Sequence, residues 1–298
     1  MAATKPKRGR PSRTAELVAA ARAEHLLRIS EPVFEDNLAY EMCGPFWRTV
    51  LASKILTRLV IDGLLKNVKP IVPVILTRAR FGEDRLESAV GDGLDQYVIL
   101  GAGFDTFAMR RKDLMANLQV YELDQPATQE LKLRRMQKRG MGKPSSVRYI
   151  QSDLNKESLH DALDRAGFDA ARPAMFSWFG VTYYLGIDTV RATLENIATN
   201  MAPGSSILFD YLADPAWIPS NAKPLHERCA AFVAKRGEPW ISSFNPPDVA
   251  GILSDLGFEE VDNLEPDKVS ERYSLRNSEF DYPPIMGICY ARTAAGSP

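Results

Sequence analysis

From about residue 93 onward, short apolar runs alternate with helical segments, and this alternation constrains the fold more than any other feature of the sequence. The apolar runs are short enough for strands, and they lie at 96–100, 119–123, 147–150, 173–179 and 206–211. Helices are predicted between them at 126–139, 157–166 and 188–201. Strands that alternate with helices predict a parallel sheet with helices on both faces.

The last part of the chain departs from this alternation. A helix predicted at 247–256 stops at Gly257, and strands follow at 258–262 and 286–292. The long segment between these two strands is rich in Pro, Tyr and charged residues. We therefore expect a final pair of strands to close an otherwise parallel sheet.

The sequence before residue 93 is helical in character. Ser12 is expected to cap a helix that extends to about Ile29, because apolar residues recur there at helical spacing. Two more amphipathic segments follow at 46–65 and 70–80. The predicted parts are a disordered basic tail at 1–13, an N-terminal helical cap region at 14–92 and the strand-containing domain at 93–298.

An insert at 212–246 interrupts the strand-containing domain. It holds Trp217, Trp240 and five prolines, and it is too long for a simple connection. Long segments above a sheet tend to form lids or substrate walls, so we expect the insert to do so.

The basic tail allows two interpretations. It carries five basic residues and no acidic one, and its core, KRGRPS, is similar to an AT-hook, which places arginines in the narrow minor groove of A·T-rich DNA. The alternative is a solvated, disordered tail. Because the motif is single and short and the rest of the chain is net acidic, we favour the tail, and nucleic acid is not an expected partner.

The composition excludes several functional classes. With 45% apolar and 25% charged residues and a net charge of −1, the chain has no general attraction to nucleic acid or acidic membranes. Its three cysteines and three histidines are scattered, which argues against a disulfide framework or a metal site and favours a reducing cytoplasm. No apolar run of about 18 residues and no signal-peptide pattern occurs, so we expect a cytoplasmic protein without a membrane partner.

The segment YVILGAGFDTFAMRR at 97–111 has the pattern of a strand, a glycine turn and a helix start, which usually holds a nucleotide. Ligands of such sheets bind beyond the carboxyl ends of the strands. After the second strand, 21 positions beyond Gly103, Asp124 can accept from both ribose hydroxyls. After the third, Asp153 can accept from an adenine amine and Leu154 can pack on the ring. Together these residues predict an adenosine site.

The glycine turn does not match a dinucleotide fingerprint. That pattern requires Gly or Ala five positions after the first glycine, where this chain has Thr106. An anionic Asp105 at the helix start would also repel a pyrophosphate. The cofactor is better explained as an adenosine without phosphates, S-adenosylmethionine.

Four motifs, VILGAGFDT, YELDQPATQELK, SDL and FSWFGVTYYL, resemble those of the leucine carboxyl methyltransferase family and its bacterial polyketide carboxyl O-methyltransferase relatives. The likeness covers about residues 70–210, is loose before them and is poor after 212. It implies an α/β class I methyltransferase fold, with a Rossmann-like, mostly parallel seven-stranded sheet that ends in the expected pair of strands. It also implies S-adenosylmethionine as the cofactor.

The resemblance implies roles for individual residues. Arg78 is expected to bind the carboxylate of the cofactor and Asp124 its ribose, with Glu122 as the competing acid. The full set expected at the cofactor is Arg78, Gly101, Ala102, Gly103, Asp124, Gln125, Asp153, Leu154, Phe179 and Gly180. This chain departs from the family at Phe179, where relatives usually carry Glu, and at Phe107, where many bacterial relatives have Arg. One expected cofactor contact is therefore absent.

The residues expected in the acceptor pocket are aromatic or basic, namely Trp178, Tyr183, Tyr184, Trp217 and Arg228. A carboxylate acceptor, with a pKa near 4, is already ionised at pH 7 and needs no general base. A phenol, with a pKa of about 10, would need one, and His226 is the candidate in the insert.

We therefore predict an S-adenosylmethionine-dependent O-methyltransferase that esterifies a carboxylate of a small metabolite, such as a secondary-metabolite or polyketide-type acid. The alternatives within this class are a phenol or hydroxyl acceptor and a protein C-terminal carboxylate. Those outside it are a nicotinamide-dependent dehydrogenase, which Thr106 disfavours, and an AT-hook DNA-binding protein with a cofactor-sensing domain.

Overall fold

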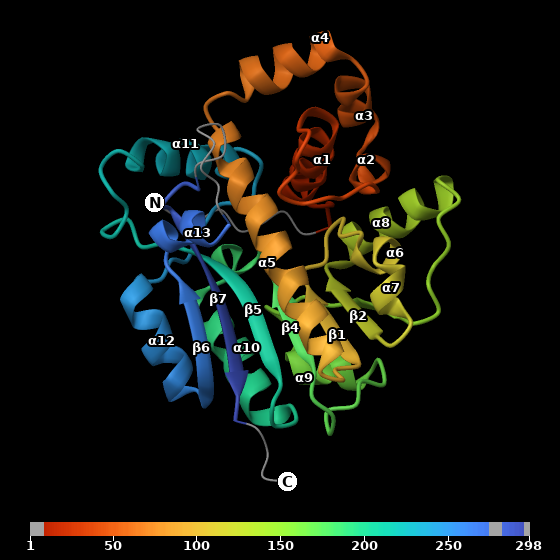
Figure 1. Ribbon diagram of the computed structural model, residues 1–298, viewed down its shortest axis with the longest axis vertical. Coiled ribbons are helices and arrows are strands. Elements are labelled where there is room, and N and C mark those ends of the chain that lie inside the picture. Colours follow the sequence, from red (N-terminus) through yellow and green to blue (C-terminus); the bar gives the residue numbers. More distant parts are fainter. Residues whose placement is uncertain (1–8, 274–281, 295–298) are drawn as a thin grey trace.

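A seven-stranded sheet forms the centre of the molecule, with the strand order β3-β2-β1-β4-β5-β7-β6 (Figure 1). The computed structural model describes residues 9–273 and 282–294. The strands are β1 (Gln96–Leu100), β2 (Gln119–Asp124), β3 (Val147–Gln151), β4 (Met175–Trp178), β5 (Ser206–Leu212), β6 (Phe258–Leu264) and β7 (Met286–Thr293). Each strand lies within two residues of its predicted bounds.

The expected sheet topology is confirmed. Strands β1 to β5 pair in parallel, whereas β7 runs antiparallel to both β5 and β6. Strands β1, β2, β4 and β5 are almost completely buried, as their near-continuous apolar runs indicated, whereas the edge strand β3 is only partly buried. The residues that follow β1, β2, β3 and β4 therefore meet along one edge of the sheet.

Helices cover both faces of the sheet. On one face, α9 (Leu159–Asp164), α10 (Ile187–Asn200) and α12 (Pro246–Asp255) pack against the strands in one apolar cluster. On the other face, α5 (Val72–Gly91), α6 (Phe107–Arg110), α7 (Lys112–Met115) and α13 (Pro266–Arg272) contribute to a second cluster, and α5 crosses the front of the sheet in Figure 1. The predicted 70–80 segment is thus the start of a helix that continues to Gly91.

The N-terminal segments form a helical cap above the carboxyl edge of the sheet (Figure 1). It consists of α1 (Arg13–Arg28), α2 (Ala39–Met42), α3 (Pro45–Leu51), α4 (Lys54–Thr57), the π-helix η1 (Arg58–Leu64) and the 3₁₀ turn η2 (Lys69–Ile71). Ser12 caps α1 as expected, since its side chain accepts from the backbone N–H of Ala15. Apolar residues of α1 and α2 pack on α8 (Pro126–Lys138), so the cap contacts the helix that connects β2 to β3.

The insert at 212–246 lies beside the cap. It contains α11 (Lys223–Ala234), and Ala213 pairs with Phe244 where the insert leaves and rejoins the fold. A short 3₁₀ turn, η3 (Thr182–Tyr184), follows β4 and contacts the insert through a hydrogen bond from the N–H of Ile241 to the carbonyl of Tyr183. Among the helices in the described part of the chain, none is long and apolar enough to cross a membrane.

Candidate functional site

A cavity of about 820 Å³ lies between the carboxyl edge of the sheet and the cap. Residues that directly follow β1, β2, β3 and β4 line it from below, while α1, η1, α5 and the end of α11 line it from the sides. Ligands of open α/β sheets bind at this edge. The cavity therefore lies at the edge of the sheet where the sequence predicts an adenosine site.

The loop after β1 strongly favours glycine at two positions. Gly101 and Gly103 have φ angles of +68° and +52°, and a Cβ on Gly101 would lie 2.3 Å from Cγ2 of Val181. Both glycines and Ala102 line the cavity. The helix that follows, α6, has only four residues, so the loop does not lead into the long helix on which dinucleotide pyrophosphates bind.

Arg22 of α1 holds this glycine loop from the cap. Its Nη2 donates to the carbonyl of Phe104 at 3.0 Å, and its Nη1 lies 3.3 Å from Asp36 and 3.7 Å from Asp105. The side chain is buried between the two parts of the molecule. This contact was not predicted, because its one signal in the sequence is a basic residue within the alanine-rich middle of the first helix.

The end of β2 separates the two candidate ribose acids. Asp124 lines the cavity, and its carboxylate accepts from the backbone N–H groups of Gly103 and Gln125. Burial raises the pKa of Asp124 to about 6, although these two hydrogen bonds oppose the shift. Glu122 instead pairs with Lys132 beneath the cavity, where burial raises its pKa and the charge of Lys132 opposes that rise.

Arg78 reaches the cavity from α5, and it is paired with an acid that the sequence analysis did not single out. Its Nη1 donates to Asp210 at 2.6 Å and to the hydroxyl of Tyr183 at 3.1 Å. The other oxygen of Asp210 accepts from the N–H of Gly180. Burial alone would lower the pKa of Arg78, but the charges and hydrogen bonds of Asp210 and Tyr183 together outweigh burial and raise it. The signal for Asp210 was a lone acid in the apolar run SILFDYL.

The loop after β3 brings Asp153 and Leu154 to the cavity, as expected. Asp153 accepts from Nζ of Lys156 at 2.7 Å and from the N–H of Asn155 at 3.2 Å. Desolvation would raise the pKa of Asp153, but these hydrogen bonds lower it overall. The side chain is therefore a carboxylate at neutral pH.

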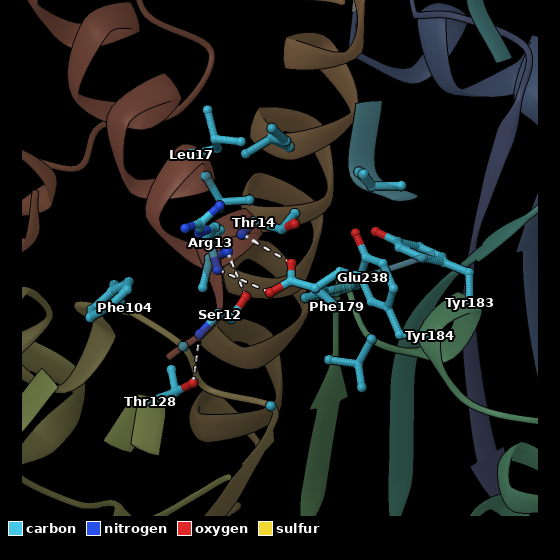
Figure 2. A pocket seen from close by; sticks show the side chains of 18 of the residues that line it. Ser12, Arg13, Thr14, Leu17, Phe104, Thr128, Phe179, Tyr183, Tyr184 and Glu238 are labelled. Carbon is cyan, nitrogen blue, oxygen red and sulfur yellow. Dashed lines mark hydrogen bonds between the residues drawn. The ribbon is translucent and has the colours of Figure 1, made fainter. Parts of the chain in front are cut away.

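The N-terminus of α1 closes the cavity together with Glu238, which follows α11 (Figure 2). The two carboxylate oxygens of Glu238 accept from the N–H groups of Arg13 and Thr14 at 3.0 and 3.1 Å. The N–H of Ser12 donates to Oγ1 of Thr128, at the start of α8, at 3.1 Å. Within the segment expected as a tail, residues 1–8 lie outside the described residues, whereas Ser12 and Arg13 make these contacts.

The structure brings only some of the expected aromatic residues to the cavity. Phe179, Tyr183 and Tyr184 line it, and Figure 2 shows all three on one side of it, close to Glu238. Gly180 also lines it, as does Trp240 of the insert, whose ring lies 5.7 Å from that of Tyr183. The sequence analysis noted Trp240 but did not assign it to the pocket.

Three residues expected in the acceptor pocket lie elsewhere. Trp178 is completely buried in the core beneath the sheet edge, because the last residue of β4 points into the helical layer. Trp217 and Arg228 are exposed on the outer side of the insert and do not line the cavity. Trp217 lies in an irregular segment, which has no fixed period, and Arg228 lies on α11, a helix that the sequence analysis did not predict.

His226 also does not line the cavity. Its ring packs near that of Trp240, at 5.7 Å between centroids, and burial lowers its pKa. Among the residues that the structure describes, no group of three or more His, Cys, Asp or Glu side chains could hold a metal ion.

Comparison with known proteins identifies relatives of this chain. Residues 15–198 match the model of the leucine carboxyl methyltransferase family. The protein YktD of Bacillus subtilis (strain 168), assigned by name to the S-adenosyl-L-methionine-dependent methyltransferases, is 32% identical over 214 residues, which are 71% of this chain and 70% of YktD. A protein of Mycolicibacterium vanbaalenii with the same assignment is 32% identical over 202 residues, covering 66% of this chain and 65% of its own length.

Solved structures of distant sequence share the fold. A protein of Thermobifida fusca YX assigned to the methyltransferases superposes with a TM-score of 0.60 at 16% identity, covering 98% of this chain and 96% of its own. A DUF574 family protein of Streptomyces avermitilis gives a TM-score of 0.60 at 14% identity, with 92% and 97% covered. These similarities support the architecture described above.

Proposed function

We propose that this chain, which belongs to the leucine carboxyl methyltransferase family of S-adenosylmethionine-dependent methyltransferases, esterifies the carboxylate of a small molecule with an apolar body. The observation that carries the proposal is the set of residues that line the cavity. It combines residues that suit an adenosine, an apolar inner wall and carboxylates that all have partners.

The cofactor residues are assigned from the way they converge. Asp124 would accept from the ribose hydroxyls, and Asp153 and Leu154 would meet the adenine. The positive φ angles of Gly101 and Gly103 keep the loop free of side chains where the nucleoside would lie. When bound, S-adenosylmethionine supplies an electrophilic methyl group on a sulfonium.

Arg78 suits the amino-acid end of the cofactor. Its Nη1 is committed to Asp210 and Tyr183, so Nη2 and Nε are left to face a carboxylate. A Cβ on Gly180 would lie 2.8 Å from Nη2, which explains why this position is glycine. Because the pair of Arg78 and Asp210 is neutral overall, it fits a zwitterionic group better than a phosphate.

Phe179 stands where the family usually has Glu, and its ring lies against α5. A Cβ on Gly82 would be 2.7 Å from that ring, so the aromatic side chain fills the space beside the helix. The face of an aromatic ring can contact a cation such as a sulfonium. Such a contact would take the place of the charged contact that Glu provides in relatives. We assign Phe179 this role.

The acceptor would lie against the apolar wall of the cavity. That wall comes from α1, η1, the η2 segment, the start of α5 and α11, and its members are Leu17, Val18, Ile61, Leu65, Val68, Ile71, Ile75, Cys229 and Phe232. Few polar side chains interrupt it, so the body of the acceptor is apolar. A wall of this kind favours an aliphatic or aromatic acid over a strongly polar metabolite.

The absence of a free base among the described cavity residues supports a carboxylate acceptor. Glu83 pairs with Arg110, Asp153 with Lys156, and Glu238 with the N–H groups of α1. Glu24, Asp105 and Asp124 likewise have cationic or N–H partners. Burial raises the pKa of Tyr183 well above its usual value, so its hydroxyl stays protonated. A carboxylate needs none of these groups to take a proton.

The product distinguishes the candidate reactions. Carboxylic acids with apolar bodies are incubated with isotopically labelled S-adenosylmethionine, and the product is treated with mild alkali. A methyl ester releases labelled methanol, as the proposal requires. A labelled product that resists alkali would instead show transfer to a phenol or hydroxyl.

A further inference from the structure

The outer face of α4 and η1 exposes an unusual amount of apolar surface. Ile55, Leu59 and Leu64 are 73%, 61% and 80% exposed, and Leu56 lies beside them in the same segment. We call these four side chains the apolar cap face. Leu27 and Phe46 of the adjoining helices are also more than 60% exposed, so most of the large exposed apolar side chains of the described residues belong to the cap.

This exposure is not explained by the inner packing of the segment. Its opposite side, with Ile61 and Leu65, lines the cavity. The segment therefore has apolar side chains on both sides, whereas an ordinary surface helix turns mainly polar side chains to water. An exposed apolar patch of this kind marks an interaction surface.

Basic residues surround the apolar cap face. Between residues 46 and 69 the sequence has five basic residues and one acidic residue. The acid, Asp62, is already paired with Arg28 at 3.0 Å and Lys69 at 2.7 Å. Lys54, Arg58 and Lys66 are exposed and form no ion pair within the part of the chain that the structure describes. The net charge of the whole chain is close to zero, but this part of its surface is both apolar and locally cationic.

We propose that the apolar cap face docks on an anionic lipid surface. Exposed leucine and isoleucine side chains bordered by Lys and Arg are the features by which amphipathic helices lie in a membrane interface. Anionic headgroups would complement the three unpaired cations. A second copy of this chain is a poorer occupant, because a two-fold interface would bring the same cations of both copies together. The docking is independent of which acceptor is methylated.

Vesicle co-sedimentation of the full chain, without cofactor, tests this proposal. We expect the protein to sediment with vesicles of phosphatidylcholine and phosphatidylglycerol, and much less with phosphatidylcholine alone. Ile55→Glu and Leu59→Glu should abolish sedimentation without lowering the melting temperature, since both side chains are exposed. The matched control is Ile187→Glu, an exposed isoleucine on α10, which should sediment like the unmodified protein.

A charge reversal separates lipid docking from general stickiness. Arg58→Glu should weaken binding to the anionic vesicles by about fivefold or more. The control is Arg148→Glu, an exposed arginine on β3, which should have little effect.

Two outcomes would overturn the proposal. One is an absence of sedimentation with anionic vesicles. The other is a concentration-dependent dimer in analytical ultracentrifugation that Leu59→Glu dissociates, because the face would then be an interface between copies of this chain.

Discussion

Arg78 of α5 and Asp210 of β5 form a buried ion pair with 2.6 Å between Nη1 and Oδ2, although 132 positions separate them in the chain. Asp210 also accepts from the N–H of Gly180, and Arg78 donates to Tyr183. A helix, a strand and the loop after β4 therefore meet at one charged contact beside the cavity. Removing one partner of such a pair leaves the other charge buried and unpaired.

We expect Asp210→Ala to lower the free energy of unfolding by about 3–5 kcal/mol, because Arg78 then stays buried without its counter-charge. Denaturant unfolding measures this change. Asp84→Ala is the matched control, since it breaks the exposed pair of Arg80 and Asp84 and should cost about 0.5 kcal/mol or less.

The double variant Arg78→Met and Asp210→Leu tests binding apart from stability. Much of the lost stability should return, because no lone charge remains buried. Affinity for S-adenosylhomocysteine, measured by calorimetry, should stay low if Arg78 binds the cofactor. Recovery of both properties would show that the ion pair is purely structural.

We expect the affinity for the cofactor to depend on pH, because Asp124 titrates near neutral pH. Burial raises the pKa of its carboxyl to about 6, and the ionised form is the one that accepts from two ribose hydroxyls. Lowering the pH below about 6 should therefore weaken S-adenosylhomocysteine binding, by at most about tenfold per pH unit. Asp124→Asn should bind more than about tenfold more weakly at pH 7.5 and lose this pH dependence. A variant that still binds normally would remove Asp124 from the ribose site.

We expect Glu238 to hold the N-terminus of α1 at the cavity through its two hydrogen bonds. Glu238→Ala leaves the N–H groups of Arg13 and Thr14 without their acceptor and should lower the free energy of unfolding by about 1 kcal/mol. It should also speed the release of S-adenosylhomocysteine, which stopped-flow fluorescence of Trp240 can follow. Glu227→Ala, which changes an exposed acid on α11, is the control. An unchanged release rate would show that α1 does not have to move for exchange.

Methyl transfer to a carboxylate should not depend on a titrating base. We expect kcat to stay flat from about pH 7 to 9, because the acceptor is ionised throughout that range. His226→Ala should keep most of its activity, since that side chain lies outside the cavity and packs beside Trp240. A rate that rises with pH, together with a large loss in His226→Ala, would favour a phenol acceptor.

The sheet and the edge at which its strands end follow from local sequence patterns. Apolar runs alternating with helices fix a parallel sheet, and in such a sheet the residues after neighbouring strands must meet. The sequence therefore predicts that Gly101, Asp124 and Asp153 lie together, and all three line the cavity. This inference succeeded because each residue was placed by a local pattern, the end of its own strand.

The partners of the cavity residues, and the choice of side chains that reach the cavity, depend on long-range packing that local patterns do not encode. The contacts of Arg78 with Asp210 and of Glu238 with α1 join segments 132 and about 225 positions apart, and such contacts leave no periodic trace in the sequence. Trp178 and Trp240 were both plausible pocket residues, yet one is buried in the core and the other lines the cavity. The difference arises because a side chain at a strand end or in an irregular insert is directed by the packing of the elements around it.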